Sequence, residues 1–67
     1  MDKEGLILFL GQFVTLVKDD CGVPFIVDGT IKEIYNSSIL FHTNGKLIVI
    51  DFSRIKEVRP NYRGQYR

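Results

Sequence analysis

The amino-acid sequence predicts an all-β protein: a small, strongly bent, five-stranded antiparallel barrel that follows a short N-terminal helix. Apolar and polar residues alternate with a period of two from Phe13 onward, which is typical of strands. Asn44-Gly45 is the dipeptide most typical of a two-residue hairpin turn. The chain has 67 residues and five strand-like segments, and a bent meander of that size closes most easily as a barrel.

The helix is predicted over residues 3–10. Asp2 precedes it as an N-cap, and Gly11 suits its C-terminal end. Three apolar side chains at helical spacing form one stripe: Leu6, Phe9 and Leu10. An edge strand is the alternative interpretation, because the run is continuously apolar.

The first two strands are predicted over residues 13–18 and 25–35, with a turn at 19–22 between them. Phe25, Val27, Gly29 and Ile31 share one face of the second strand, whereas Ile34 falls on the opposite parity. A glycine inside a strand followed by a slip in parity predicts a sharp bend or a bulge.

The last three strands are predicted over residues 39–42, 46–52 and 55–58, and Pro60 is expected to end the last one. Residues 39–41 and 47–50 are continuously apolar, which is typical of strands buried on both faces. The core and a neighbouring subunit would supply these two coverings.

Charge divides the chain into two parts. Residues 1–58, the predicted barrel domain, carry six Lys or Arg against eight Asp or Glu, whereas residues 59–67 carry three arginines and no acid. The basic, nucleic-acid-like character is therefore confined to a C-terminal tail rich in tyrosine and arginine.

The chain has few means of stabilising so small a core. Its single cysteine, Cys21, allows no intrachain disulfide, and Cys21 with His42 are too few ligands for a structural zinc ion. Oligomerisation is left as the expected supplement. The sequence shows no secretory leader and no apolar run of membrane-spanning length, so we expect a soluble, cytoplasmic protein without cofactors.

The segment GTIKEIYNSSILFHTNGKLIVIDFSRI resembles the Sm/LSm family, including its Hfq-like branch. Gly29 stands where that family places the glycine that bends strand 2, and Gly45-Lys46 stands at the turn of its second motif. The resemblance covers roughly residues 5–60. It implies an Sm-like, SH3-like barrel, a homo-oligomeric ring of about five to eight subunits with strand 4 pairing strand 5 of the next copy, and binding of single-stranded RNA.

The resemblance implies RNA contacts in two loops, at Tyr35, Asn36, Phe52, Ser53 and Arg54. Aromatic rings would stack on bases, the amide would bond a base edge, and the guanidinium would hold phosphate. The alternative is that Phe52 and Tyr35 are packing residues and Arg54 is a solvated charge.

The tail interleaves cations with aromatic rings, a composition that suits RNA backbone contact and stacking: Arg59, Tyr62, Arg63, Tyr66 and Arg67. A frayed terminus is the alternative.

A second function remains open, because the chain lacks the family's RNA-recognition pairs. Its loop residues Asp51-Phe52-Ser53-Arg54 contain neither Arg-Gly nor Lys-His. The alternative is an SH3-like barrel that acts as a protein-interaction or assembly module without RNA. No catalytic motif accompanies His42 or the serines, so no enzymatic activity is expected.

Overall fold

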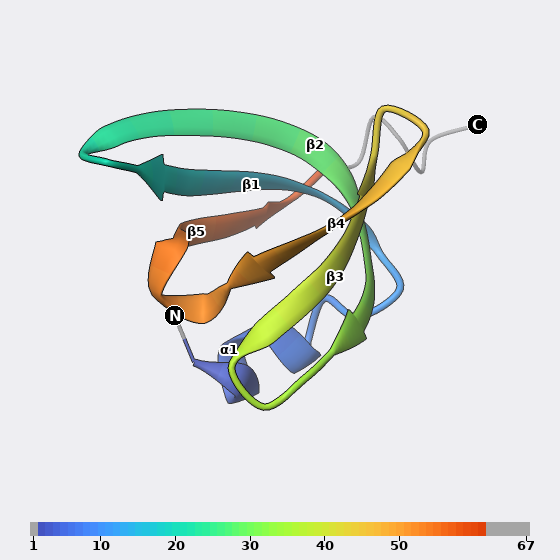
Figure 1. Cartoon of the computed structure of the whole chain (residues 1–67). Helices are drawn as coiled ribbons and strands as arrows, with labels where there is room; N and C mark the ends of the chain where they lie inside the picture. Colours follow the sequence, from blue (N-terminus) through green and yellow to red (C-terminus); the bar gives the residue numbers. More distant parts are fainter. Residues whose placement is uncertain (1, 62–67) are drawn as a thin grey trace.

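A computed structural model describes residues 2–61 of the chain, as one short helix and five antiparallel strands (Figure 1). The chain is therefore all-β, as the sequence predicts. The elements, in chain order, are α1 (Lys3–Ile7), β1 (Phe13–Asp20), β2 (Val23–Ile34), β3 (Ser38–Thr43), β4 (Lys46–Asp51), the 3-10 turn η1 (Phe52–Arg54) and β5 (Ile55–Pro60).

The sheet does not close into a barrel within one chain, which corrects the predicted closure. The strand order is β4-β3-β2-β1-β5, so β4 and β5 lie at its two edges and do not pair with each other. The strands curl around a shared interior in Figure 1, but the curl stops short of joining those two edges. A sheet closes only when its terminal strands exchange hydrogen bonds, and here each terminal strand has one neighbour among the described residues.

The predicted bend of β2 is confirmed. The register with β3 shifts between Ile31 and Glu33, which is the predicted slip in parity. β2 pairs with β1 from Val23 to Thr30 and with β3 only from Thr30 onward. The strand therefore changes neighbours at Thr30, directly after Gly29.

The core lies on the concave side of the sheet and contains Leu6, Val14, Leu16, Ile31, Ile39, Phe41, Ile50, Ile55 and Val58. The helix contributes Leu6, which is fully buried. The outer side chains of β4 are not covered within the chain: Leu47 and Val49 are 55% and 62% exposed. The second covering of β4, which the sequence leads us to expect from a neighbouring subunit, is thus not supplied by the described part of this chain.

Several boundaries differ from the predicted ones. The helix ends at Ile7 rather than at residue 10, because Leu10 forms a bridge with Ile31 and Gly11 takes a positive φ of 80°. The first hairpin turn is only Cys21-Gly22, whose φ angles are 54° and 83°, so the predicted turn residues 19–20 belong to β1.

The last strand is also longer than predicted, since β5 continues through Arg59 to Pro60. Part of the predicted basic tail is therefore a paired strand, in which Arg59 lies opposite Thr15. The Asn44-Gly45 turn is confirmed, with φ angles of 53° and 77°.

Candidate nucleic-acid interface

The two predicted RNA-binding loops lie side by side. Residues 35–37 connect β2 to β3, and the turn is held by a hydrogen bond from the Tyr35 N–H to the Ser38 carbonyl at 2.8 Å. The Phe52 N–H donates to the Ser37 carbonyl at 2.9 Å, which fastens the start of η1 to that loop. The pairing of Ser38 with Asp51 aligns the two strand ends.

The side chains of these loops differ in their exposure. Tyr35 is 41% exposed, and Asn36 and Ser53 are also exposed, so an aromatic ring, an amide and a hydroxyl are available to a ligand. Phe52 is half-buried and packs against the core, as the packing alternative expects. The loops therefore offer one exposed aromatic ring and exposed hydrogen-bonding groups, which are the kinds of group that proteins use to bind single-stranded RNA.

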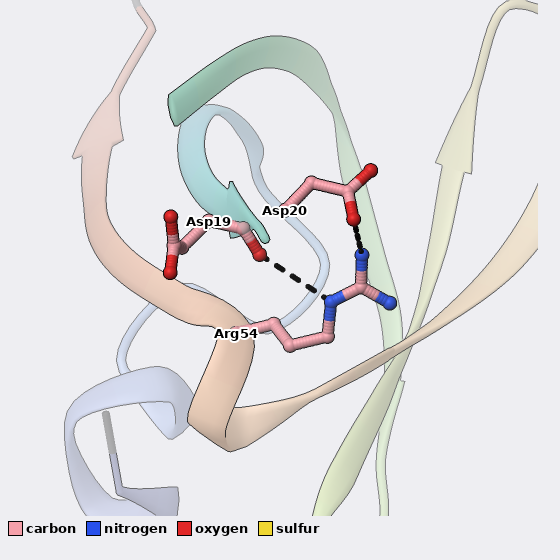
Figure 2. A network of polar contacts seen from close by, with 3 residues as sticks. All are labelled: Asp19, Asp20 and Arg54. Carbon is pink, nitrogen blue, oxygen red and sulfur yellow. Dashed lines mark hydrogen bonds and ion pairs between the residues drawn. The ribbon is translucent and has the colours of Figure 1, made fainter. Parts of the chain in front are cut away.

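Arg54 ends the same 3-10 turn, η1, but its side chain is directed toward the β1–β2 hairpin. Figure 2 shows its side chain reaching to the end of β1, where Nη2 donates to Asp20 Oδ1 at 2.9 Å and Nε donates to the Asp19 carbonyl at 3.4 Å. The 3-10 turn that precedes β5 directs the side chain toward this hairpin. Arg54 thus braces the β1–β2 hairpin and already has an acidic partner.

Arg59 is likewise engaged by an acid. Its Nε and Nη2 donate to the two carboxylate oxygens of Glu57 at 2.6 and 3.2 Å. This hydrogen bond, followed by the attraction between the charges, lowers the pKa of Glu57 below its ordinary value and raises the pKa of Arg59. The other predicted tail contacts, Tyr62, Arg63, Tyr66 and Arg67, lie outside the described residues.

A polar cluster on the outer face was not predicted. The Thr15 hydroxyl donates to Asp28 Oδ1 at 2.7 Å and accepts from Asn61 Nδ2 at 2.9 Å. The Thr43 hydroxyl donates to the Asp28 carbonyl at 2.7 Å, which links β3 to β2. Thr15 and Asp28 lie directly opposite each other in the β1–β2 ladder. Their contact could have been predicted from the sequence only if the register of this hairpin had been assigned.

The other polar side chains of residues 2–61 are exposed or partly exposed. No polar or charged side chain there is buried. That segment also contains no group of three or more His, Cys, Asp or Glu residues placed to hold a metal ion. His42 lies exposed on β3. Within the described part of the chain, no helix is both long and apolar enough to cross a membrane.

Comparison with known proteins gives no relative: no protein-family model, no curated protein and no solved structure matches this chain.

Proposed function

We propose that this chain is the subunit of an Sm-like homo-oligomeric ring that binds single-stranded RNA. The observation that carries the proposal is the strand order β4-β3-β2-β1-β5, which leaves one open strand at each end of a bent sheet. If β4 of one copy pairs with β5 of the next, both edges are covered by the same contact. A head-to-tail contact of this kind closes into a ring when its rotation allows.

The chemistry of β4 supports its role as an interface. The residues Thr43 and Lys46 flank the two-residue turn and form a hydrogen-bonded pair. Along β4, residues that bond to β3 then alternate with residues whose backbone groups face away from it. The N–H groups of Leu47 and Val49 therefore point to the open edge. Both side chains are more than half exposed. This strand thus offers unpaired backbone donors beside apolar side chains, and its burial would enlarge the core of a small domain.

The RNA-binding part of the proposal rests on the adjacent loops. A ring would repeat Tyr35, Asn36 and Ser53 once per subunit, so weak contacts of each loop would add along a strand. Base stacking on Tyr35 tolerates any sequence, because every base has an aromatic face. The tail cations, Arg63 and Arg67, would contact phosphate and make the affinity depend on salt.

The ring is tested by light scattering after size-exclusion chromatography of Val49→Pro. Proline removes the outward N–H but none of the hydrogen bonds to β3, so the fold is kept and the edge is blocked. We expect about five to eight chains for the wild type by the Sm-like resemblance and loss of that ring for the variant. Val49→Thr keeps the N–H and the β-branched shape and should stay assembled. A wild type that elutes as a monomer would sink the proposal.

RNA binding is tested by fluorescence anisotropy with uridine-rich and adenosine-rich oligonucleotides over a salt series. Tyr35→Ala should weaken binding by about 5- to 150-fold, the equivalent of ~1–3 kcal/mol for one stacked base, whereas Tyr35→Phe keeps the ring and the affinity. Equal affinity of both variants would remove the loop from the interface.

A second function is favoured by two observations: Arg54 is held by Asp20, and Phe52 packs against the core. Two of the loop residues that the resemblance assigns to RNA are therefore engaged elsewhere. The same ring would then act as an assembly scaffold without RNA. Absence of an anisotropy change at low salt, with the ring intact, selects this function.

A further inference from the structure

The outer face of the sheet carries an acid that has no cationic partner among the described residues. Asp28 is exposed on β2, and its Oδ1 accepts a hydrogen bond from the Thr15 hydroxyl at 2.7 Å. Neither of the two ion pairs within residues 2–61 includes it. Because a hydroxyl is a neutral donor, Asp28 is held in place while its negative charge stays available to a further partner.

A cation lies close to this acid, but it is already engaged. Arg59 and Asp28 are both opposite Thr15, one on each side of it in the sheet. The Arg59 guanidinium donates to both carboxylate oxygens of Glu57, at 2.6 and 3.2 Å. This pair therefore offers no cation to Asp28, and its own carboxylate is not open to another cation.

The C-terminal segment leaves the sheet beside Asp28. The Asn61 N–H donates to the Phe13 carbonyl at 3.3 Å, and Asn61 Nδ2 donates to Thr15 Oγ1 at 2.9 Å. Thr15 Oγ1 thus accepts from Asn61 and donates to Asp28, so the amide and the carboxylate are only two hydrogen bonds apart. The last described residue is therefore fixed on the outer face, next to the acid.

The next cation along the chain is two residues further on, at Arg63. It belongs to residues 62–67, which lie outside the described part of the chain and carry two arginines and no acid. Residues 1–61 carry seven Lys or Arg against eight Asp or Glu, so the charges of the two parts are complementary. Two residues of chain span at most ~7 Å, which brings the Arg63 guanidinium within reach of Asp28 without any change in the described fold.

We propose that Asp28 binds the guanidinium of Arg63 and so latches the C-terminal segment of the same chain onto the outer face of β2. The tether at Asn61 identifies this segment as the occupant, because an intramolecular partner is present at a high effective concentration. Ile26 lies two residues before Asp28 on the same face of β2 and is 70% exposed, so it offers an apolar surface to a tyrosine of the segment.

The latch also controls the RNA contact, and this second step rests on the proposed function. The Arg63 guanidinium that is paired with Asp28 is not free to pair with an RNA phosphate, so the carboxylate and the phosphate compete for one cation. RNA binding must open the latch, and the measured affinity is reduced according to the fraction of chains in which the latch is closed.

The contact itself is tested without RNA, by nuclear magnetic resonance on the full chain. In a Cys21→Ser background, Gln65→Cys places a nitroxide spin label in the segment and leaves both of its arginines intact. The label should broaden the backbone amide signals of residues 26–28, and Asp28→Asn should reduce that broadening. Unchanged broadening in Asp28→Asn would overturn the latch.

The variant and its control differ in position and not in charge. Asparagine keeps a side-chain oxygen that accepts from Thr15, so Asp28→Asn removes the charge and retains the hydrogen bond. Asp19→Asn is the matched control, because Asp19 lies on the same outer face nearer the β1–β2 turn. It should leave the broadening of residues 26–28 unchanged, and an equal reduction in both variants would also overturn the latch.

A mixed sample decides whether the segment acts on its own chain. Spin-labelled 14N chains and unlabelled 15N chains are mixed in denaturant and refolded together, so any broadening of the 15N signals comes from another copy. Weak or no broadening of residues 26–28 in this sample supports the intrachain latch. Broadening as strong as in the uniformly labelled protein would refute it.

The competition is tested by fluorescence anisotropy with a uridine-rich oligonucleotide. Asp28→Asn should raise the affinity by up to about 5-fold, which is the upper end of what an exposed ion pair contributes. Asp19→Asn should raise it less. In an Arg63→Gln background, Asp28→Asn should have no effect, since the cation that it releases is absent. Equal gains for the two asparagine variants, or a gain that survives Arg63→Gln, would exclude the competition.

The latch and the proposed function fail separately in these experiments. If the oligonucleotide binds to none of the variants, RNA binding is wrong, and the spin-label measurement alone decides the latch. If the oligonucleotide binds but Asp28→Asn alters neither the broadening nor the affinity, only the latch is wrong.

Discussion

Substitution of Gly29 by alanine should destabilise this chain more than the same substitution at Gly11, Gly22 or Gly45. Gly29 lies in β2 directly before Thr30, the residue at which β3 begins to pair with this strand. A Cβ built there would lie 2.8 and 2.9 Å from two ring atoms of Phe41, and it would overlap the backbone carbonyl oxygen of His42. No positive φ is involved at this position, so the cost comes from contact and not from backbone conformation.

The size of the effect follows from what has to move. The Phe41 ring is fully buried, and the His42 carbonyl belongs to the pair Thr30–His42 of the β2–β3 ladder, so neither can move away cheaply. Overpacking of a well-packed core costs ~1–3 kcal/mol. Because Gly29→Ala must also displace the backbone at His42, we expect its cost to be about 3 kcal/mol or more. For a domain of this size that is a Tm decrease of about 12 °C or more.

Thermal unfolding followed by circular dichroism at one fixed protein concentration measures this decrease, because an oligomer's Tm depends on concentration. Gly45→Ala is the matched control: its φ is 77° but nothing lies within 4 Å of the added Cβ, so it costs only the ~1–2 kcal/mol of a left-handed conformation. Adding Phe41→Leu to Gly29→Ala should not restore the Tm, because the added methyl group would still overlap the His42 carbonyl oxygen. A loss smaller than that of Gly45→Ala would refute the argument.

Three further changes test single contacts. Asp2→Ala removes the N-cap bond to the Gly5 N–H at 3.1 Å and should cost ~1 kcal/mol in thermal unfolding, with Asp2→Asn retaining most of it. Arg54→Ala should lower the free energy of unfolding by less than ~1 kcal/mol, because the ion pair with Asp20 is about half exposed. It should nevertheless speed hydrogen exchange of the backbone amides in residues 19–24. Unchanged exchange rates would contradict the proposed role of Arg54 in holding the β1–β2 hairpin. The stability that Glu57 gains from Arg59 is fully present above the ordinary carboxyl pKa of 4.5 and is lost as the pH falls through the lowered pKa of the folded state. Glu57→Gln should therefore lack this part of the pH dependence of stability. An NMR titration that places the pKa of the folded Glu57 carboxyl at or above 4.5 would contradict this prediction.

Local chemistry made much of the fold predictable. Asn44-Gly45 identifies its own turn, because few other residues accept positive φ at both central positions. The slip in parity before Ile34 predicts the bulge, since one extra residue must reverse the faces of everything that follows. In both cases the information lies within a few neighbouring residues.

The remaining features depend on residues far apart in the sequence. Arg54 and Asp20 meet 34 positions apart, and no local pattern indicates that pairing. The turn at Cys21-Gly22 lacks the asparagine that is typical of such turns. Asp19 and Asp20 are therefore predicted from the sequence as turn residues, although they lie in β1. Closure of the sheet is also a long-range property, because it depends on whether β4 and β5 pair with each other. The sequence pattern of each strand would be the same in an open and in a closed sheet.

The distribution of the two prolines distinguishes the open edges from one another. Pro24 lies in β2 with its nitrogen facing outward. Pro60 lies opposite Val14, whose backbone groups face β2, so its nitrogen also points away from the sheet. Each of these edges thus lacks one donor and accepts a partner strand only in limited registers. β4 has no proline, and its outward N–H groups accompany the exposed Leu47 and Val49. An unprotected apolar edge of this kind favours indiscriminate pairing in an isolated chain, and the proposed contact with β5 of a second copy would cover it.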